Sequence, residues 1–89
     1  MNKVTFTHSA LKQFESWVEI NPRVASKLIK LIMESTKNPY DGNGNPERLK
    51  HELNEFWSRR INNEHRLVYK VENDSLIIVS CMYHYQRIS

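Results

Sequence analysis

The fold is decided by residues 56–71, which read FWSRRINNEHRLVYKV. Two runs rich in aromatic and β-branched residues form the ends of this stretch, and the polar tripeptide NNE at 62–64 separates them. Because such runs favour strands and a short polar segment between them favours a turn, the stretch predicts an antiparallel hairpin. If residues 62–64 form a three-residue turn, Arg60 lies directly opposite Arg66.

Strand register determines which side chains of this hairpin share a face, because side chains alternate between the two faces. One face collects residues suited to packing against helices: Trp57, Ile61, Leu67, Tyr69 and Val71. The other face collects Phe56, Ser58, Arg60, Arg66, Val68 and Lys70. A slip of one residue would mix the two sets. The pairing that unites the apolar residues therefore also unites Arg60 and Arg66.

A third strand follows the hairpin. The turn-forming segment 72–75 leads into residues 76–83, which are again rich in apolar and β-branched side chains. The predicted strands 56–61, 66–71 and 76–83 therefore form an antiparallel meander. Upstream, residues 38–46 hold both glycines and two of the three prolines, which predicts a loop between this sheet and a helical N-terminal part.

The N-terminal part predicts a short strand at 3–6 followed by two helices. With Thr7 or Ser9 as the N-cap, the first helix has an apolar stripe formed by Ala10, Leu11, Phe14, Trp17 and Val18. Asn21-Pro22 predicts the start of the second helix. Its predicted buried face is formed by Val24, Leu28, Leu31 and Ile32, and its opposite side by Arg23, Lys27, Lys30 and Glu34. A helical hairpin on one face of the antiparallel sheet is an α+β fold.

Length and composition narrow the class of protein. The chain has 89 residues, which predicts a single domain, 1–89. With Cys81 as the only cysteine, no intramolecular disulfide forms, which fits a reducing compartment. The N-terminus does not resemble a secretion signal, and the longest aliphatic run, 76–79, is far shorter than the ~20 residues of a membrane helix. We therefore expect a cytoplasmic protein.

Positive charge points to a class of partner. The net charge is +3, and the pI is about 9.2, which favours polyanions. Arg60 and Arg66 repel each other when they lie opposite, so an anion between them is expected. A phosphate fits, because a guanidinium binds its oxygens two at a time. The alternatives are a solvated basic face and ion pairs with Glu47, Glu52 or Glu64.

Two further residues are candidates for proton transfer. His84 follows the last predicted strand, and a histidine in a basic cleft donates a proton near neutral pH. Its neighbours Tyr83 and Tyr85 are suited to stacking an unpaired base. Glu47 follows the loop and stands beside basic residues, where it can accept a proton. The alternatives are surface positions for both candidates and ordinary strand packing for the tyrosines.

The sequence shows no motif for a metal site, a nucleotide site or a catalytic nucleophile. The remaining histidines do not form a metal-ligand spacing with Cys81, so neither a metal nor another cofactor is predicted. There is no phosphate-binding glycine loop, no nucleophile elbow and no dinucleotide fingerprint. Cys81 lies in an apolar strand and is expected to be a buried thiol.

The C-terminal half resembles the YoeB family of bacterial toxins. The matching stretches are GNGNPERLKH at 42–51, FWSRRI at 56–61, EHRLVY at 64–69 and CMYHY at 81–85. The resemblance extends over almost the whole chain, since the N-terminal helices also match in length and placement. It implies a fold similar to RelE and to small microbial ribonucleases.

Members of that family cut messenger RNA in the ribosomal A site, so the resemblance implies a metal-independent endoribonuclease that acts by 2′-OH transesterification and inhibits translation. It implies that Glu47 is the general base, Arg66 the catalytic cation at the phosphate, and His84 the general acid. The substrate-binding residues that it implies are Lys50, Arg60 and Tyr85.

The resemblance implies partners as well. A YefM-like antitoxin would cover the basic cleft, and operator DNA would be contacted only through the toxin–antitoxin complex. Homodimers are typical of the family. The alternative function is a catalytically silent module that binds RNA, the ribosome or the antitoxin, for example as a corepressor. A third is a relative that interferes with ribosomes without cutting.

Two departures from the family pattern affect the site. Arg48 replaces the proline that usually follows the glutamate. Family members typically stop at the tyrosine, whereas this chain continues beyond Tyr85 with residues 86–89. This extension leaves the placement of Tyr85 open.

Overall fold

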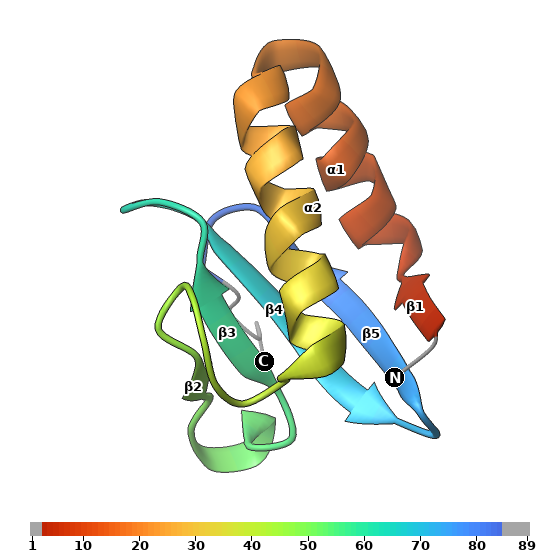
Figure 1. Ribbon diagram of the computed structural model, residues 1–89, viewed down its shortest axis with the longest axis vertical. Coiled ribbons are helices and arrows are strands. Elements are labelled where there is room, and N and C mark those ends of the chain that lie inside the picture. The colour runs from red at the N-terminus through yellow and green to blue at the C-terminus, as the bar shows by residue number, and fades with distance from the viewer. Residues whose placement is uncertain (1–2, 85–89) are drawn as a thin grey trace.

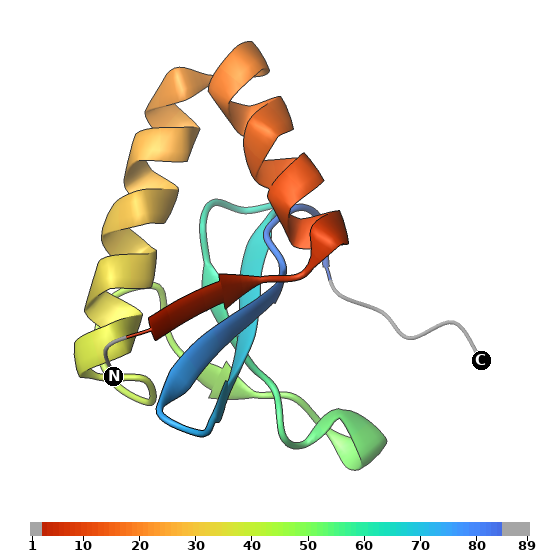
Figure 2. The ribbon, with the colours of Figure 1, turned by 90° about the vertical axis from the view of Figure 1, so that its right-hand side faces the viewer.

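The computed structural model describes residues 3–84. Its elements, in chain order, are β1 (Lys3–Phe6), α1 (His8–Ile20), α2 (Pro22–Lys37), β2 (Glu47–Arg48), the 3-10 helix η1 (His51–Leu53), β3 (Trp57–Arg60), β4 (Arg66–Glu72) and β5 (Ser75–Ser80). The strands form one sheet in the order β1-β5-β4-β3-β2. The two helices lie side by side as a hairpin on one face of the sheet (Figures 1 and 2). This arrangement confirms the predicted α+β fold.

Strand pairing confirms the predicted register of the central hairpin. In the β3–β4 ladder, Trp57 lies opposite Tyr69, and Arg60 lies opposite Arg66. The turn is closed by the N–H of Ile61, which donates to the carbonyl of His65 at 3.0 Å. The helix-facing and open faces of this hairpin are therefore the two sets that periodicity predicts.

The edges of the sheet were only partly predicted. β1 pairs in parallel with β5, so that Val4 lies opposite Leu76 and Phe6 opposite Ile78. The helical hairpin supplies the long crossover that a parallel pair requires. At the other edge, β2 lies just after the predicted loop and pairs antiparallel with β3. The sequence predicts neither pairing, because in each case the two paired strands are not connected by a short turn.

The helices differ from the prediction in which side chains they bury. Thr7 is the N-cap of α1, and its hydroxyl accepts the N–H of Ala10 at 3.1 Å. Trp17 is buried with Ala10, but Leu11 is 53% exposed and Val18 is 48% exposed. The predicted stripe of α1 was thus too wide, because this helix contacts its neighbours along a narrow line.

The helical hairpin turns at one residue, Asn21. Its N–H donates to the carbonyl of Trp17 at 2.8 Å, and its own carbonyl accepts the N–H of Val24 at 3.0 Å. Pro22 opens α2 as predicted, although the Asn21 side chain makes no capping hydrogen bond. The buried residues of α2 are Ala25, Leu28, Leu31, Ile32 and Ser35.

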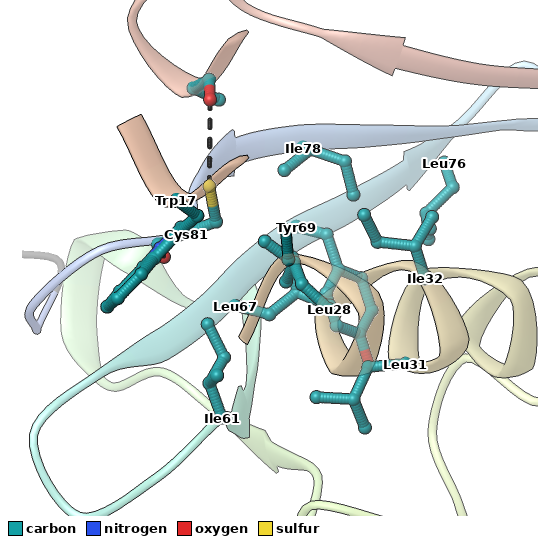
Figure 3. Packing of buried hydrophobic residues seen from close by; sticks show 12 residues of the cluster. Trp17, Leu28, Leu31, Ile32, Ile61, Leu67, Tyr69, Leu76, Ile78 and Cys81 are labelled. Atoms are coloured by element: carbon teal, nitrogen blue, oxygen red, sulfur yellow. Dashed lines mark hydrogen bonds between the residues drawn. The ribbon is translucent and has the colours of Figure 1, made fainter. Parts of the chain in front are cut away.

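The core lies between the helices and the sheet. Figure 3 shows Leu28, Leu31 and Ile32 of α2 meeting Leu67 and Tyr69 of β4 and Leu76 and Ile78 of β5. Trp17 of α1 donates its indole N–H to the carbonyl of Cys81 at 2.8 Å. The Cys81 thiol is buried, as predicted, and contacts the carbonyl of Ala10 at 3.6 Å. Burial raises the pKa of this thiol to about 12.

The last strand is shorter than predicted. β5 ends at Ser80, whereas the sequence indicated a strand to residue 83, so His84 does not stand at a strand end. β5 also contains a β-bulge, because Val68 pairs with Ser80 and Tyr69 with Ile78, which leaves one extra residue in β5. The chain then bends away from β5.

Neither helix in residues 3–84 is long and apolar enough to cross a membrane.

Candidate active site

A pocket of about 220 Å³ lies on the open face of the sheet, opposite the helices. Its lining comes from the loop before β2, from β2, β3 and β4, and from the segment after β5. The lining residues are Asn45, Glu47, Leu49, Ser58, Arg60, Arg66, Val68 and His84. Four predicted site residues, far apart in the sequence, therefore meet around one cavity: Glu47, Arg60, Arg66 and His84.

The short strand β2 places the carboxylate. Glu47 lies directly opposite Ser58, and paired residues present their side chains on the same face. Arg60 is two residues further along β3 on that face, a spacing of about 7 Å along a strand. The exposed carboxylate of Glu47 accepts a hydrogen bond from the amide of Asn45 at 3.2 Å. Glu47 therefore lies on the same face as the arginine pair and lines the same pocket.

A buried arginine holds the loop that leads to Glu47. Arg59 is fully buried on the helix side of β3, and its N–H groups donate to oxygens of Tyr69, Glu34, Asn43, Asn38 and Asp41. Since an arginine has five such donors, every one is satisfied. Three of the acceptors are carbonyls of the loop at 38–46. Arg59 thus ties this loop to the sheet.

Glu34, whose side chain is 28% exposed, completes the network around Arg59. Its carboxylate lies 2.8 Å from Arg59 and also accepts the backbone N–H of Asn43 at 2.5 Å. The hydrogen bond from Asn43, together with the nearby Arg59 charge, lowers the pKa of Glu34. The sequence placed Glu34 on the side of α2 opposite its buried residues, and its carboxylate nevertheless reaches the buried Arg59. Its partner is 25 residues away, so helical periodicity alone cannot reveal the pairing.

Gly44 brings the loop close against β3. Its carbonyl accepts the N–H of Arg60 at 2.6 Å, and its φ is +83°. A Cβ at this position would stand 3.0 Å from the Cβ of Arg59 and 3.1 Å from the carbonyl oxygen of Arg60. Only glycine fits both the conformation and the close approach without strain. This contact sets where Asn45 and Glu47 enter the pocket.

The arginine pair has no carboxylate partner within residues 3–84. The ion pairs there do not include Arg60 or Arg66, so the alternative in which Glu47, Glu52 or Glu64 neutralises them is not what the structure shows. Arg66 is oriented by its own turn, because one guanidinium nitrogen donates to the carbonyl of Asn62 at 2.8 Å. Two unneutralised cations on one wall make the pocket suited to an anion such as a phosphate.

The two remaining predicted site residues stand apart from the four. Lys50 is exposed just before η1 and is not part of the pocket lining. Tyr85 lies outside the described residues. Sequence reasoning in turn missed four lining residues. Ser58 and Val68 follow from register, whereas Asn45 and Leu49 depend on the path of the loop. Among the described residues, no cluster of three or more metal-ligating side chains occurs.

A helical hairpin on one face of a five-stranded mixed sheet is the fold of RelE- and YoeB-type toxins. The family described as "YoeB-like toxin of bacterial type II toxin-antitoxin system" matches residues 6–85. The chain belongs to this family, and it is thus a toxin of a type II toxin–antitoxin system.

Individual relatives cover nearly the whole chain. Toxin YoeB of Escherichia coli (strain K12) is 45% identical over 83 residues, which are 93% of this chain and 99% of that protein. The solved YoeB/ParE toxin from Agrobacterium tumefaciens is 36% identical with a TM-score of 0.90, covering 93% and 99% of the two chains.

YoeB from Staphylococcus aureus has been solved both as a dimer and in a YoeB–YefM complex. The TM-scores are 0.87 and 0.85, at 37% and 38% identity, and each match covers 93% of this chain and 97% of that one.

Proposed function

We propose that this toxin is a ribosome-dependent endoribonuclease that cleaves messenger RNA in the A site and thereby inhibits translation. The observation that carries the proposal is the meeting of Glu47, Arg66 and His84 around one basic pocket. A protein that only binds RNA or an antitoxin needs the cations, but it needs neither a carboxylate nor a histidine beside them. Together, these groups supply a base, a charge stabiliser and an acid.

The proposed reaction is transesterification within the RNA strand. Glu47 removes the proton from a 2′-OH, and the 2′-oxygen attacks the adjacent phosphorus. As the new O–P bond forms, the bond from phosphorus to the 5′-oxygen breaks, and His84 gives that oxygen a proton. The products are a 2′,3′-cyclic phosphate and a 5′-hydroxyl. DNA lacks the attacking hydroxyl and is not cut.

The arginines act on the charge that develops during this step. Arg66 and Arg60 stabilise the non-bridging oxygens, and loss of one such preorganised donor typically slows a reaction by ~100- to 1,000-fold. We assign substrate-binding roles to Arg60, Lys50 and Tyr85. Lys50 lies exposed beyond the pocket lining, where it can meet a phosphate further along the strand.

The proposed partners follow from charge and from the relatives. A YefM-like antitoxin with an acidic segment would cover the basic pocket, as charge complementarity favours. The S. aureus YoeB structures contain YefM in one case and a YoeB dimer in another, which supports an antitoxin complex and a homodimer here. Operator DNA would be reached only through the antitoxin. The site of action is the cytoplasm, where ribosomes translate messenger RNA.

The cellular test is induction of the wild type and of His84→Gln, with growth followed and transcript 5′ ends mapped. The wild type should arrest growth and create new 5′ ends within reading frames, and His84→Gln should do neither at equal protein level. A wild type that neither arrests growth nor creates new ends contradicts the enzyme function.

A purified system separates cleavage from simple blocking. Ribosomes programmed with defined A-site codons are mixed with the toxin, and the RNA is analysed for cut ends and for a 2′,3′-cyclic phosphate. Cleavage that depends on the ribosome supports the proposal. Stable binding with intact RNA would favour a silent ribosome-binding module instead.

A further inference from the structure

His65 is a histidine outside the pocket that the proposed reaction does not use. It precedes β4, and its imidazole is packed between two aromatic rings. The ring of Trp17 meets it edge-on at 4.8 Å and 89°, and the ring of Tyr83 lies 5.0 Å away at 50°. Its backbone is held by the turn, because its N–H donates to the side-chain oxygen of Asn62 at 2.9 Å. Both the ring and the backbone of His65 are therefore held in place.

The imidazole makes one specific hydrogen bond. The backbone N–H of Tyr83 donates to Nδ1 of His65 at 2.7 Å. A ring nitrogen that accepts a hydrogen bond carries no proton, so His65 is neutral in this state and its proton is on Nε2. The tautomer of His65 is thus set by the chain segment that follows β5.

The backbone conformation of Tyr83 is one that requires stabilising hydrogen bonds. Its φ is +58°, a left-handed conformation that non-glycine residues seldom adopt. Both of its backbone polar groups are hydrogen-bonded to two consecutive residues where β4 begins: the N–H donates to the ring of His65, just before β4, and the carbonyl accepts the backbone N–H of Arg66 at 3.0 Å. The next residue in the chain is His84, which lines the pocket together with Arg66.

We propose that His65 is a positioning residue: its neutral imidazole, by accepting the Tyr83 N–H, holds the left-handed turn at Tyr83 and so directs His84 into the pocket beside Arg66. The inference rests on the proposed function for its consequence in catalysis, but the positioning itself is a structural claim.

The surroundings of His65 are largely aromatic. α1 faces the ring with the uncharged indole of Trp17, and the segment after β5 faces it with the phenol of Tyr83. The charged groups beside it in the chain are Glu64 and Arg66.

Two substitutions separate the hydrogen bond from the packing. In His65→Phe, a ring remains between its aromatic neighbours but the acceptor is lost. In His65→Asn, the side-chain oxygen can occupy the place of Nδ1 and accept the same hydrogen bond. His8→Phe is the matched control, because His8 is exposed at the start of α1 and does not line the pocket. Melting temperatures show whether each variant folds.

The direct readout is NMR of the purified toxin, with the wild type and the variants compared at one pH. In the wild type, the ring nitrogens of His65 should show the Nε2–H tautomer. In His65→Asn the His84 ring signals should match the wild type. In His65→Phe the His84 signals should move. An Nδ1–H tautomer, or His84 signals unchanged in His65→Phe, overturns the inference.

The catalytic readout is single-turnover cleavage on programmed ribosomes. A misplacement of about 1 Å in a reacting group costs ~100-fold, so His65→Phe should slow cleavage by about that factor, and His65→Asn should recover most of it. Equal rates for the wild type and His65→Phe overturn the inference. If the wild type itself cuts no RNA, the proposed function fails, and the NMR result alone decides whether His65 positions His84.

Discussion

Arg59 and Arg60 are consecutive residues of β3, yet their environments are opposite. Arg59 points toward the helices, is fully buried and uses all five of its donors on protein oxygens. Arg60 points to the open face, is exposed and lies opposite Arg66 without a carboxylate partner in residues 3–84. The same side chain thus serves the fold on one face and is left available for an anion on the other.

The difference shows how a chain this short can build a site. A buried arginine is tolerated only when its charge and donors are satisfied, and Glu34 and the loop carbonyls do this. An exposed arginine beside another cation carries a repulsion that only a ligand offsets. The alternation of side chains along β3 therefore places a structural arginine on one face and an arginine available to a ligand on the other. Variants on the helix face should change stability, and variants on the open face should change cleavage.

The largest expected effect is on the open face. Glu47→Gln removes the proposed base while keeping the size of the side chain, so cleavage on programmed ribosomes should fall by about 100- to 10,000-fold. The melting temperature should stay close to that of the wild type, because Glu47 is exposed. Glu19→Gln on α1 is the control and should cleave normally. A Glu47→Gln protein that cleaves at the wild-type rate would remove Glu47 from the mechanism.

The next effect is on the helix face and concerns stability. Arg59→Met takes the donor away from the buried hydroxyl of Tyr69 and from several loop carbonyls, and each buried polar group left unsatisfied costs about 1–3 kcal/mol. Arg60→Met should change stability by no more than about 0.5 kcal/mol, since it is a surface substitution. Urea denaturation measures both. Equal stability of the two variants would contradict the conclusion that Arg59 stabilises the fold and Arg60 does not.

Gly44→Ala tests the contact between the loop and β3. The added Cβ meets the backbone of Arg60 in a left-handed conformation, so a loss of about 1–3 kcal/mol is expected. Ser26→Ala on the exposed side of α2 is the control. Thermal unfolding gives the stability, and cleavage should fall as well, because the loop sets the place of Glu47. A stable variant with normal cleavage would show that the loop can shift without consequence.

The smallest effect is the pH dependence of stability that comes from Glu34, the partner of Arg59. The pKa of Glu34 in the folded protein is below its ordinary value of 4.5, so the unfolded chain binds a proton at higher pH than the folded protein does. The stability that Glu34 contributes is therefore full above pH 4.5 and is lost as pH falls through the folded pKa. Melting temperature against pH should fall less steeply in Glu34→Gln than in the wild type below pH 4.5. Parallel curves would contradict this coupling.

Local patterns were sufficient for much of this protein. Alternation in residues 56–71 predicted the β3–β4 register and both faces, including the meeting of Arg60 and Arg66. Asn21-Pro22 predicted the helical turn, and the apolar context predicted the burial of Cys81. Resemblance, and not pattern, supplied the proposed roles of Glu47 and His84. Each of these inferences depends on neighbours in the chain or on a motif within a short stretch.

Contacts between distant segments were decided only in the tertiary structure. Periodicity states that Arg59 shares a face with Trp57 but not that Glu34 lies there to meet it. The parallel pairing of β1, the short strand at Glu47 and the early end of β5 likewise depend on partners far along the chain. The sequence by itself determined which side chains share a face, because that follows from backbone geometry. Which faces and loops come together depends on packing the whole chain, and that brought His84 to Arg66.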